Sequence, residues 1–208
     1  MYMPAHFEET DAVAVQGLIA AFPLATVVVH ADHGLVANHF PLLATSSDIL
    51  IGHLAIANDL HRLVADGTDV LAIFQGNDAY ISPNWYPSKA ATHKAVPTWN
   101  YSTVHLHGKI SFQHDEKSKI AAVGRLTQRF ERETNGADGW RMADAPTDYM
   151  ATMLANIVAF KIEVTRVLAK SKLSQNRDDA DFGGVANALD QNGNKDMARR
   201  MRALRRDT

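Results

Sequence analysis

The sequence predicts a mainly β, α+β fold, in which an antiparallel β-barrel carries peripheral helices. Several segments alternate apolar and polar side chains with the period of two that is typical of a β-strand. The links between them are mostly turn-like, and only a few segments have a helical pattern. The chain has 208 residues, 46% of them hydrophobic, which is enough for a sizeable core. We expect one domain over residues 1–184 and a basic helical tail over residues 185–208.

The first half of the chain alternates strands with two short helices. Asp11 is a good N-cap for a helix that ends near Ala21. Residues 24–30 are rich in β-branched side chains and predict a strand, which a turn at Gly34 connects to a second strand over 35–43. Further strands are expected over 49–54 and 70–75. Between them we expect a helix over 58–67, with Gly67 at its C-cap.

The second half of the chain predicts two more helices and the clearest strand. Residues 115–134 have a helical pattern, whose expected buried face is Ile120, Val123, Leu126, Thr127 and Phe130. A second helix is expected over 146–156, with Pro146 near its first turn. Residues 158–165 then alternate apolar with polar side chains, which is the antiparallel pattern with one buried face.

Composition excludes several classes of protein and site. The absence of cysteine excludes disulfides, thiolate metal sites and cysteine nucleophiles, and it is compatible with a cytoplasmic protein. The first ten residues lack a basic region ahead of an apolar one, which argues against a signal peptide. The longest apolar run, over 12–29, is interrupted by Gln16, Gly17 and Pro23, so we expect no membrane span. A net charge of −2 argues against a broadly basic, DNA-coating surface.

Residues 75–108 concentrate polar and aromatic side chains more densely than any other part of the chain. Two strand-like pieces, over 79–82 and 96–107, flank a Pro-rich connector over 83–95. Long connectors inside compact domains usually carry function. This one contains Trp85, Tyr86, Ser88, Lys89, His93 and Lys94.

The strand over 96–107 has an apolar face that becomes polar at its start. Val104, Leu106 and Ile110 continue the stripe that begins with Thr98, Asn100 and Ser102. Uncharged polar side chains on a core-facing stripe need hydrogen-bond partners. Two interpretations remain open: these side chains lie beyond the edge of the core and meet water, or they line a ligand pocket. The opposite face carries Trp99, Tyr101, Thr103, His105 and His107, amphipathic groups that suit an interface.

Several short sequence motifs together resemble those of one family. AYISPNWYPSK, VPTWNY and HLHG, with GHLAIAN at 52–58 and KLSQNR at 172–177, resemble the PaiB family over nearly the whole chain. This resemblance implies an FMN-binding negative transcriptional regulator, built as a homodimer on the split β-barrel of the pyridoxamine-phosphate oxidases. FMN is then expected at the dimer interface. One departure from the family pattern is that Asp59, Leu60 and His61 follow Asn58, where the family tends to have Pro-x-Trp.

The resemblance also implies a set of cofactor-binding residues, and it identifies no catalytic residue. The KSKLSQNR segment offers cations and a hydroxyl that suit a flavin phosphate, although a solvated charged loop would have the same composition. His39 and Pro41 lie in a strand whose backbone could also contact the ring. The expected set is Asn38, His39, His53, Ser82, Thr98, Asn100, Lys172, Gln175 and Arg177.

Other functions compete with this interpretation. His105 and His107 share a strand face, and His53 could join them, but a metal site needs three or four ligands, so structural or interface roles are favoured. A haem ligand and a flavin-dependent oxidoreductase remain open alternatives.

The basic helix over 194–208 could contact DNA phosphates, but no helix-turn-helix pair accompanies it, and a solvated or docking helix is the favoured interpretation. Ser82 is not in a GxSxG elbow, which argues against a hydrolase.

Overall fold

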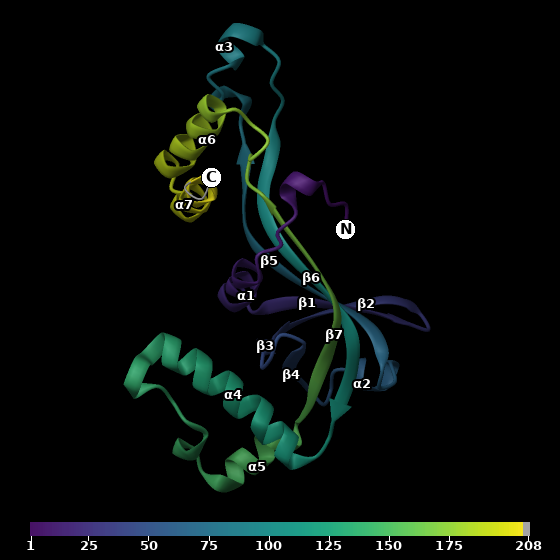
Figure 1. The fold of residues 1–208 in the computed structure, drawn as a ribbon. Coiled ribbons are helices and arrows are strands. Elements are labelled where there is room, and N and C mark those ends of the chain that lie inside the picture. The colour runs from purple at the N-terminus through teal and green to yellow at the C-terminus, as the bar shows by residue number, and fades with distance from the viewer. Residues whose placement is uncertain (206–208) are drawn as a thin grey trace. The chain divides into compact units, whose positions relative to one another are not determined.

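The computed structural model describes residues 1–205, and it divides into two compact units (Figure 1). The first unit consists of Met1–Leu18, Gln75–Val104 and Leu168–Thr208, of which residues 206–208 are not described. The second consists of Ile19–Phe74 and His105–Val167. Arg206, Asp207 and Thr208 of the predicted basic tail therefore lie outside the described residues.

Seven strands form one sheet, in the order β2-β1-β5-β6-β7-β4-β3. The register pairs Val27 of β1 with Asn38 of β2, and His53 of β4 with Ala159 of β7, both antiparallel. The three longest strands, β5, β6 and β7, contribute residues to both units. The strands are β1 (Leu24–Ala31), β2 (Gly34–Pro41), β3 (Leu43–Ala44), β4 (Ile49–Ala55), β5 (Thr68–Ile81), β6 (Thr98–Gln113) and β7 (Ile157–Lys172).

The helices occur at the ends of strands and in the connections between them. Asp115 caps the longest one, α4, by accepting a hydrogen bond from the Ser118 amide. The α-helices are α1 (Ala12–Ala21), α2 (Leu60–Leu63), α3 (Lys89–Thr92), α4 (Glu116–Asn135), α5 (Thr147–Ala155), α6 (Asp179–Gln191) and α7 (Lys195–Leu204). Four short 3-10 helices, η1 to η4, cover Ala5–Phe7, Pro83–Trp85, Gly136–Asp138 and Met142–Asp144. None of the helices in residues 1–205 is long and apolar enough to cross a membrane.

The second unit has an apolar core between its strands. Phe40 and Phe160 meet edge to face, with ring centroids 5.2 Å apart. Gly52 allows this packing, because a Cβ there would lie 2.6 Å from the ring of Phe160. Side chains that are fully buried in this unit include Val27, Leu42, Leu50, Phe74, Ile110, Phe160 and Ile162.

The first unit has a separate core that α6 and α7 build against the ends of β5 and β7. Ile81 and Leu173 from the sheet meet Val185, Leu189 and Met201 from the helices. The connector is attached to α6 by the buried carboxylate of Asp181, which accepts hydrogen bonds from the amide (3.0 Å) and hydroxyl (2.7 Å) of Ser88. Residue 184, where we expected the barrel domain to end, lies inside α6.

The structure differs from the predicted elements in three places. The helix expected over 58–67 is wrong over most of its length, because Val64 is extended (φ −133°, ψ 143°) and only α2 is helical. The strands expected over 70–75 and 79–82 form one strand, β5, whose exposed polar residues around Asn77 concealed its continuity. In α4 the buried residues are Ala122 and Leu126, whereas Ile120 is 43% exposed. The other predicted helices and strands are present, and the basic helix is α7, which buries Met197 and Met201.

Two adjacent glycines of α6 provide a matched stability test. A Cβ on Gly184 would lie 2.3 Å from the carbonyl oxygen of Trp85, whereas a Cβ on Gly183 would meet nothing within 4 Å. We therefore expect Gly184→Ala to lower the free energy of unfolding by about 1–3 kcal/mol, because the backbone must shift. Gly183→Ala should leave it unchanged or raise it by up to about 1 kcal/mol, through helix propensity. Urea denaturation of both variants measures the difference, and equal effects would contradict this description of the contact.

Candidate functional site

The polar start of β6 is buried beneath the C-terminal helix of the first unit. Asn100 and Ser102 are completely buried. The Asn100 amide oxygen accepts a hydrogen bond from the Ser174 hydroxyl at 3.1 Å, and its nitrogen lies 3.6 Å from the Met201 sulfur. The Ser102 hydroxyl accepts a hydrogen bond from Arg200 at 2.9 Å. These side chains do not meet water as one interpretation required; protein groups cover them and satisfy their hydrogen bonds.

Lys172 and Arg177 are half-buried cations next to these buried polar side chains. Lys172 Nζ donates to the Thr98 hydroxyl at 2.5 Å. The Arg177 guanidinium lies 4.6 Å from the centroid of the Tyr86 ring. Within residues 1–205, neither cation pairs with a carboxylate. Burial, and also the nearby cations Lys170 and Arg177, lower the pKa of Lys172, against an opposing effect of Tyr101.

The loop that carries Arg177 has a defined shape. Ser174 adopts a left-handed conformation with φ +64°, which is uncommon for a residue other than glycine. The Gln175 side chain accepts a hydrogen bond from the Leu173 amide at 2.7 Å, and it donates to the Ser171 carbonyl. The Arg177 carbonyl in turn accepts a hydrogen bond from Arg205 at 2.6 Å. The expected residue Gln175 therefore shapes the loop, and Arg205 holds the backbone at Arg177.

Lys170 lies next to this layer but has a different environment. It is only 6% exposed, and its ammonium lies 5.3 to 5.9 Å from the ring centroids of Tyr2, Phe7 and Tyr101. It also donates to the Tyr2 carbonyl at 3.2 Å. A buried lysine that is held by aromatic faces tethers the N-terminal arm, so it is not available as a free cation.

Three expected residues belong to the second unit. Asn38 accepts a hydrogen bond from the Asn58 amide at 2.8 Å, and His39 is exposed. Nδ1 of His53 is buried and has no hydrogen-bond partner among the described residues. Burial lowers the pKa of His53 below its ordinary value of 6.5, because desolvation favours the neutral ring over the charged one. A buried polar atom without a partner is uncommon and suits a ring that meets a ligand.

The expected set is thus divided between the units. Thr98 contacts Lys172, and Asn100 contacts Ser174, within the first unit. Ser82 belongs to the same unit, but its hydroxyl caps a 3-10 helix by accepting from the Asn84 amide at 3.2 Å. Asn38, His39 and His53 belong to the second unit. The sequence interpretation missed Arg200, although its place beside Met197 and Met201 on one helix could have indicated a partly buried cation.

The histidines do not form a metal cluster in the described part of the chain. No group of three or more His, Cys, Asp or Glu side chains there could hold a metal ion. His107 contacts Arg166, with Nε2 3.1 Å from the guanidinium. Burial lowers the pKa of His105 as well as that of His107.

Known proteins share both the sequence and the fold of this chain. The protease synthase and sporulation protein PAI 2 of Bacillus subtilis is 33% identical over 211 residues, which cover 100% of this chain and 97% of the relative. An uncharacterized protein of Aspergillus fumigatus is 30% identical over 174 residues, which cover 77% of this chain and 66% of that protein. Among solved structures, the flavocytochrome Anf3 of Azotobacter vinelandii superposes with a TM-score of 0.62 at 14% identity, covering 88% of this chain and 78% of Anf3.

A second solved structure and a family model agree with these relatives. The FAD and heme binding protein of Mycobacterium smegmatis superposes with a TM-score of 0.59 at 19% identity, covering 86% of this chain and 79% of that protein. These superpositions confirm the predicted α+β split β-barrel. Residues 1–166 match the family model described as "Putative FMN-binding domain", so FMN is the cofactor that the family assigns to this chain. The chain belongs to the PaiB family of FMN-binding split-barrel proteins.

Proposed function

We propose that this protein is an FMN-binding negative transcriptional regulator that works as a cytoplasmic homodimer. The observation that carries the proposal is the similarity to PAI 2, which extends over the whole chain. That relative is named a protease synthase and sporulation protein. A regulator that binds FMN can couple its output to the redox state of the cell, because bound flavin accepts and releases electrons.

The first unit supplies a donor set that fits the phosphate of FMN. Lys172 and Arg177 are two cations without a carboxylate partner among the described residues, and their mutual repulsion would decrease on binding an anion. The Arg177 guanidinium can donate two hydrogen bonds to phosphate oxygens, and the Lys172 ammonium supplies a localised positive charge. Thr98 adds a hydroxyl. We assign Asn100 a positioning role, because it is buried and acts on Ser174.

The second unit contains three of the expected cofactor-binding residues. His53 is neutral and has an unpaired buried nitrogen, so it can donate or accept a hydrogen bond at a ring atom. Asn38 is held by Asn58, and His39 is exposed next to it on β2. We propose these three side chains as flavin-binding groups of the second unit, and Ser82 and Gln175 as residues that shape the backbone of the first unit.

An exposed aromatic surface supports the homodimer. Tyr80 and Trp99 are 48% and 52% exposed, and their rings meet edge to face at 5.9 Å. Val96, close to Trp99 along the chain, is 68% exposed. Adjacent exposed aromatics are costly in water and are typical of protein interfaces. We propose that a second copy of the chain covers this face of β5 and β6.

The arginines at the C-terminal helix α7 contact other groups of the same chain, which is relevant to whether this helix binds DNA directly. Arg199 pairs with Asp196, Arg202 with Asp190 at 3.1 Å, and Arg205 with Asp179. Arg200 is half-buried, and it donates a hydrogen bond to Ser102. Removal of α7 would also expose Met197 and Met201, so a deletion would unfold the first unit rather than test DNA contact.

The phosphate assignment predicts a selective loss of FMN affinity. Lys172→Ala or Arg177→Ala should weaken FMN binding by about 10- to 100-fold, because each removes a charged hydrogen bond. Binding of riboflavin, which lacks the phosphate, should change less than about threefold. Flavin fluorescence titrations measure both ligands. Lys94→Ala, at an exposed lysine of the connector, is the matched control. An equal loss for FMN and riboflavin would reject the phosphate contact.

The environment of His53 predicts a pH dependence with a defined sign. Because the folded-state pKa is lowered, the unfolded chain takes up the proton first as the pH falls. The stability contributed by His53 is therefore complete above about pH 6.5 and is lost as the pH decreases below it. An NMR titration should give His53 a midpoint below 6.5, assigned through its missing signal in His53→Asn. A midpoint at or above 6.5 would contradict the burial of this ring, and His39→Asn is the control for assignment.

The regulatory role predicts direct DNA binding with a modest contribution from α7. FMN-loaded protein should retard its own promoter fragment in a gel, with affinity that falls as salt rises. Arg199→Ala should change this affinity by less than about threefold, because Asp196 already pairs with that arginine. No retardation of DNA even at low salt would refute direct binding.

A second candidate is a flavin-dependent oxidoreductase on the same fold, because the FMN that the family binds can accept and release electrons. In this case the FMN-loaded protein should oxidise NADPH or NADH with repeated turnover, followed at the nicotinamide absorbance. A flavin that stays oxidised with both donors would exclude these donors and leave the regulator as the supported function.

A further inference from the structure

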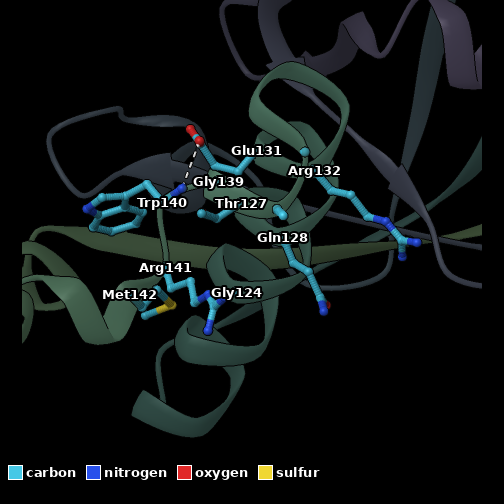
Figure 2. Close-up of a pocket in the computed structure, with 11 residues that line it drawn as sticks. Gly124, Thr127, Gln128, Glu131, Arg132, Gly139, Trp140, Arg141 and Met142 are labelled. Carbon is cyan, nitrogen blue, oxygen red and sulfur yellow. Dashed lines mark hydrogen bonds between the residues drawn. The ribbon is translucent and has the colours of Figure 1, made fainter.

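We propose that the second unit contains a separate binding site for a small aromatic carboxylate, between α4 and the loop that follows it. A hollow of about 920 Å³ lies there. Figure 2 shows the residues that line it, including Thr127 and Gln128 on α4 and Trp140, Arg141 and Met142 on the loop. None of the residues assigned to FMN lines this hollow.

The loop is held against α4 in a defined shape. The Glu131 carboxylate accepts hydrogen bonds from the Trp140 amide at 3.0 Å, marked by the dashed line in Figure 2, and from the Asn135 side chain at 2.7 Å. A Cβ on Gly139 would lie 3.0 Å from the Glu131 carbonyl oxygen, so a larger residue there would require the two backbones to separate by a few tenths of an ångström. Gly136 turns the chain with φ +60°. The hollow is therefore built by specific contacts.

The loop presents an aromatic face and a cation to the solvent. Trp140 is 42% exposed, which is costly for the largest apolar side chain. Arg141 extends from the same loop toward Gly124 of α4 (Figure 2). Its guanidinium pairs with no carboxylate among residues 1–205. The Arg141 backbone amide, rather than its side chain, donates to Asp144 at 2.8 Å. Glu131, the acidic residue of the lining, is already engaged by two donors.

These groups select the chemistry of the ligand. An indole face stacks on a planar ring, and an unpaired guanidinium binds a carboxylate with two parallel hydrogen bonds. The volume of about 920 Å³ is in the range of small-molecule sites. Thr127 and Gln128 add polar groups on the wall formed by α4. A ring that carries one carboxylate offers a partner to the indole and to a guanidinium of the lining, which includes Arg132 as well as Arg141.

Calorimetric titration of the FMN-loaded protein with 1-naphthoate tests the proposal. We expect a dissociation constant on the order of 1 mM or tighter for a ligand of this size. Two comparison ligands separate the contributions: 1-naphthalenemethanol lacks the charge, and cyclohexanecarboxylate lacks the aromatic ring. Each should bind at least about tenfold more weakly than 1-naphthoate. Because the readout is heat of binding to this ligand, it is independent of flavin chemistry and of DNA binding.

Variants of Arg141 and Trp140 test whether 1-naphthoate binds in this hollow. Arg141→Ala and Trp140→Leu should each weaken 1-naphthoate binding by about tenfold or more, with FMN affinity unchanged. Lys117→Ala removes the same charge from an exposed position of α4 outside the lining and should have no effect. Binding that is unaffected by Arg141→Ala and Trp140→Leu would overturn the proposal. So would equal affinity for 1-naphthalenemethanol, or no heat at about 10 mM ligand.

Discussion

The first unit depends on the need to satisfy the buried amide and hydroxyl at the start of β6. Asn100 and Ser102 are completely buried, and an amide or hydroxyl without partners there would cost about 1–3 kcal/mol. Ser174 and Arg200 supply the hydrogen bonds, so the loop after β7 and the helix α7 must both be in place. The same requirement positions the end of β7, which carries Lys172, and the loop after it, which carries Arg177. The hydrogen bonds that Asn100 and Ser102 require therefore determine the positions of Lys172 and Arg177.

The fold was predictable because its signals are local. Alternation over 158–165 and the helical pattern over 115–134 identified a strand and a helix that the structure confirms. The continuity of β5 could not be read from a period of two, since Asn77 and Asp78 are both exposed and the ladder is formed by distant residues. The helix expected at 58–67 failed for a related reason. Gly67 donates to the Ile110 carbonyl, a contact with β6 that local propensity does not contain.

The candidate site was predictable only in part. The resemblance named Lys172 and Arg177, and the structure shows that both lack a carboxylate partner in its described part. The sequence did not indicate that α7 covers Asn100, because this packing joins residues about a hundred positions apart, such as Asn100 and Met201. Lys170 illustrates the opposite case. Its sequence neighbourhood suggests a free cation, but three aromatic rings of distant segments surround it.

The close contact between Gly184 and the Trp85 carbonyl divides the connector into two parts with different tolerance to change. The part near Trp85 is tied to α6, both there and through the bond between Ser88 and Asp181, so insertions in it would disturb the helix. The stretch around Ala91 and His93 is exposed and makes few contacts of this kind. Exposed loop tips accept inserted sequence most readily. A fluorophore or affinity peptide for following this protein in cells therefore belongs at residues 90–94, away from the chain ends.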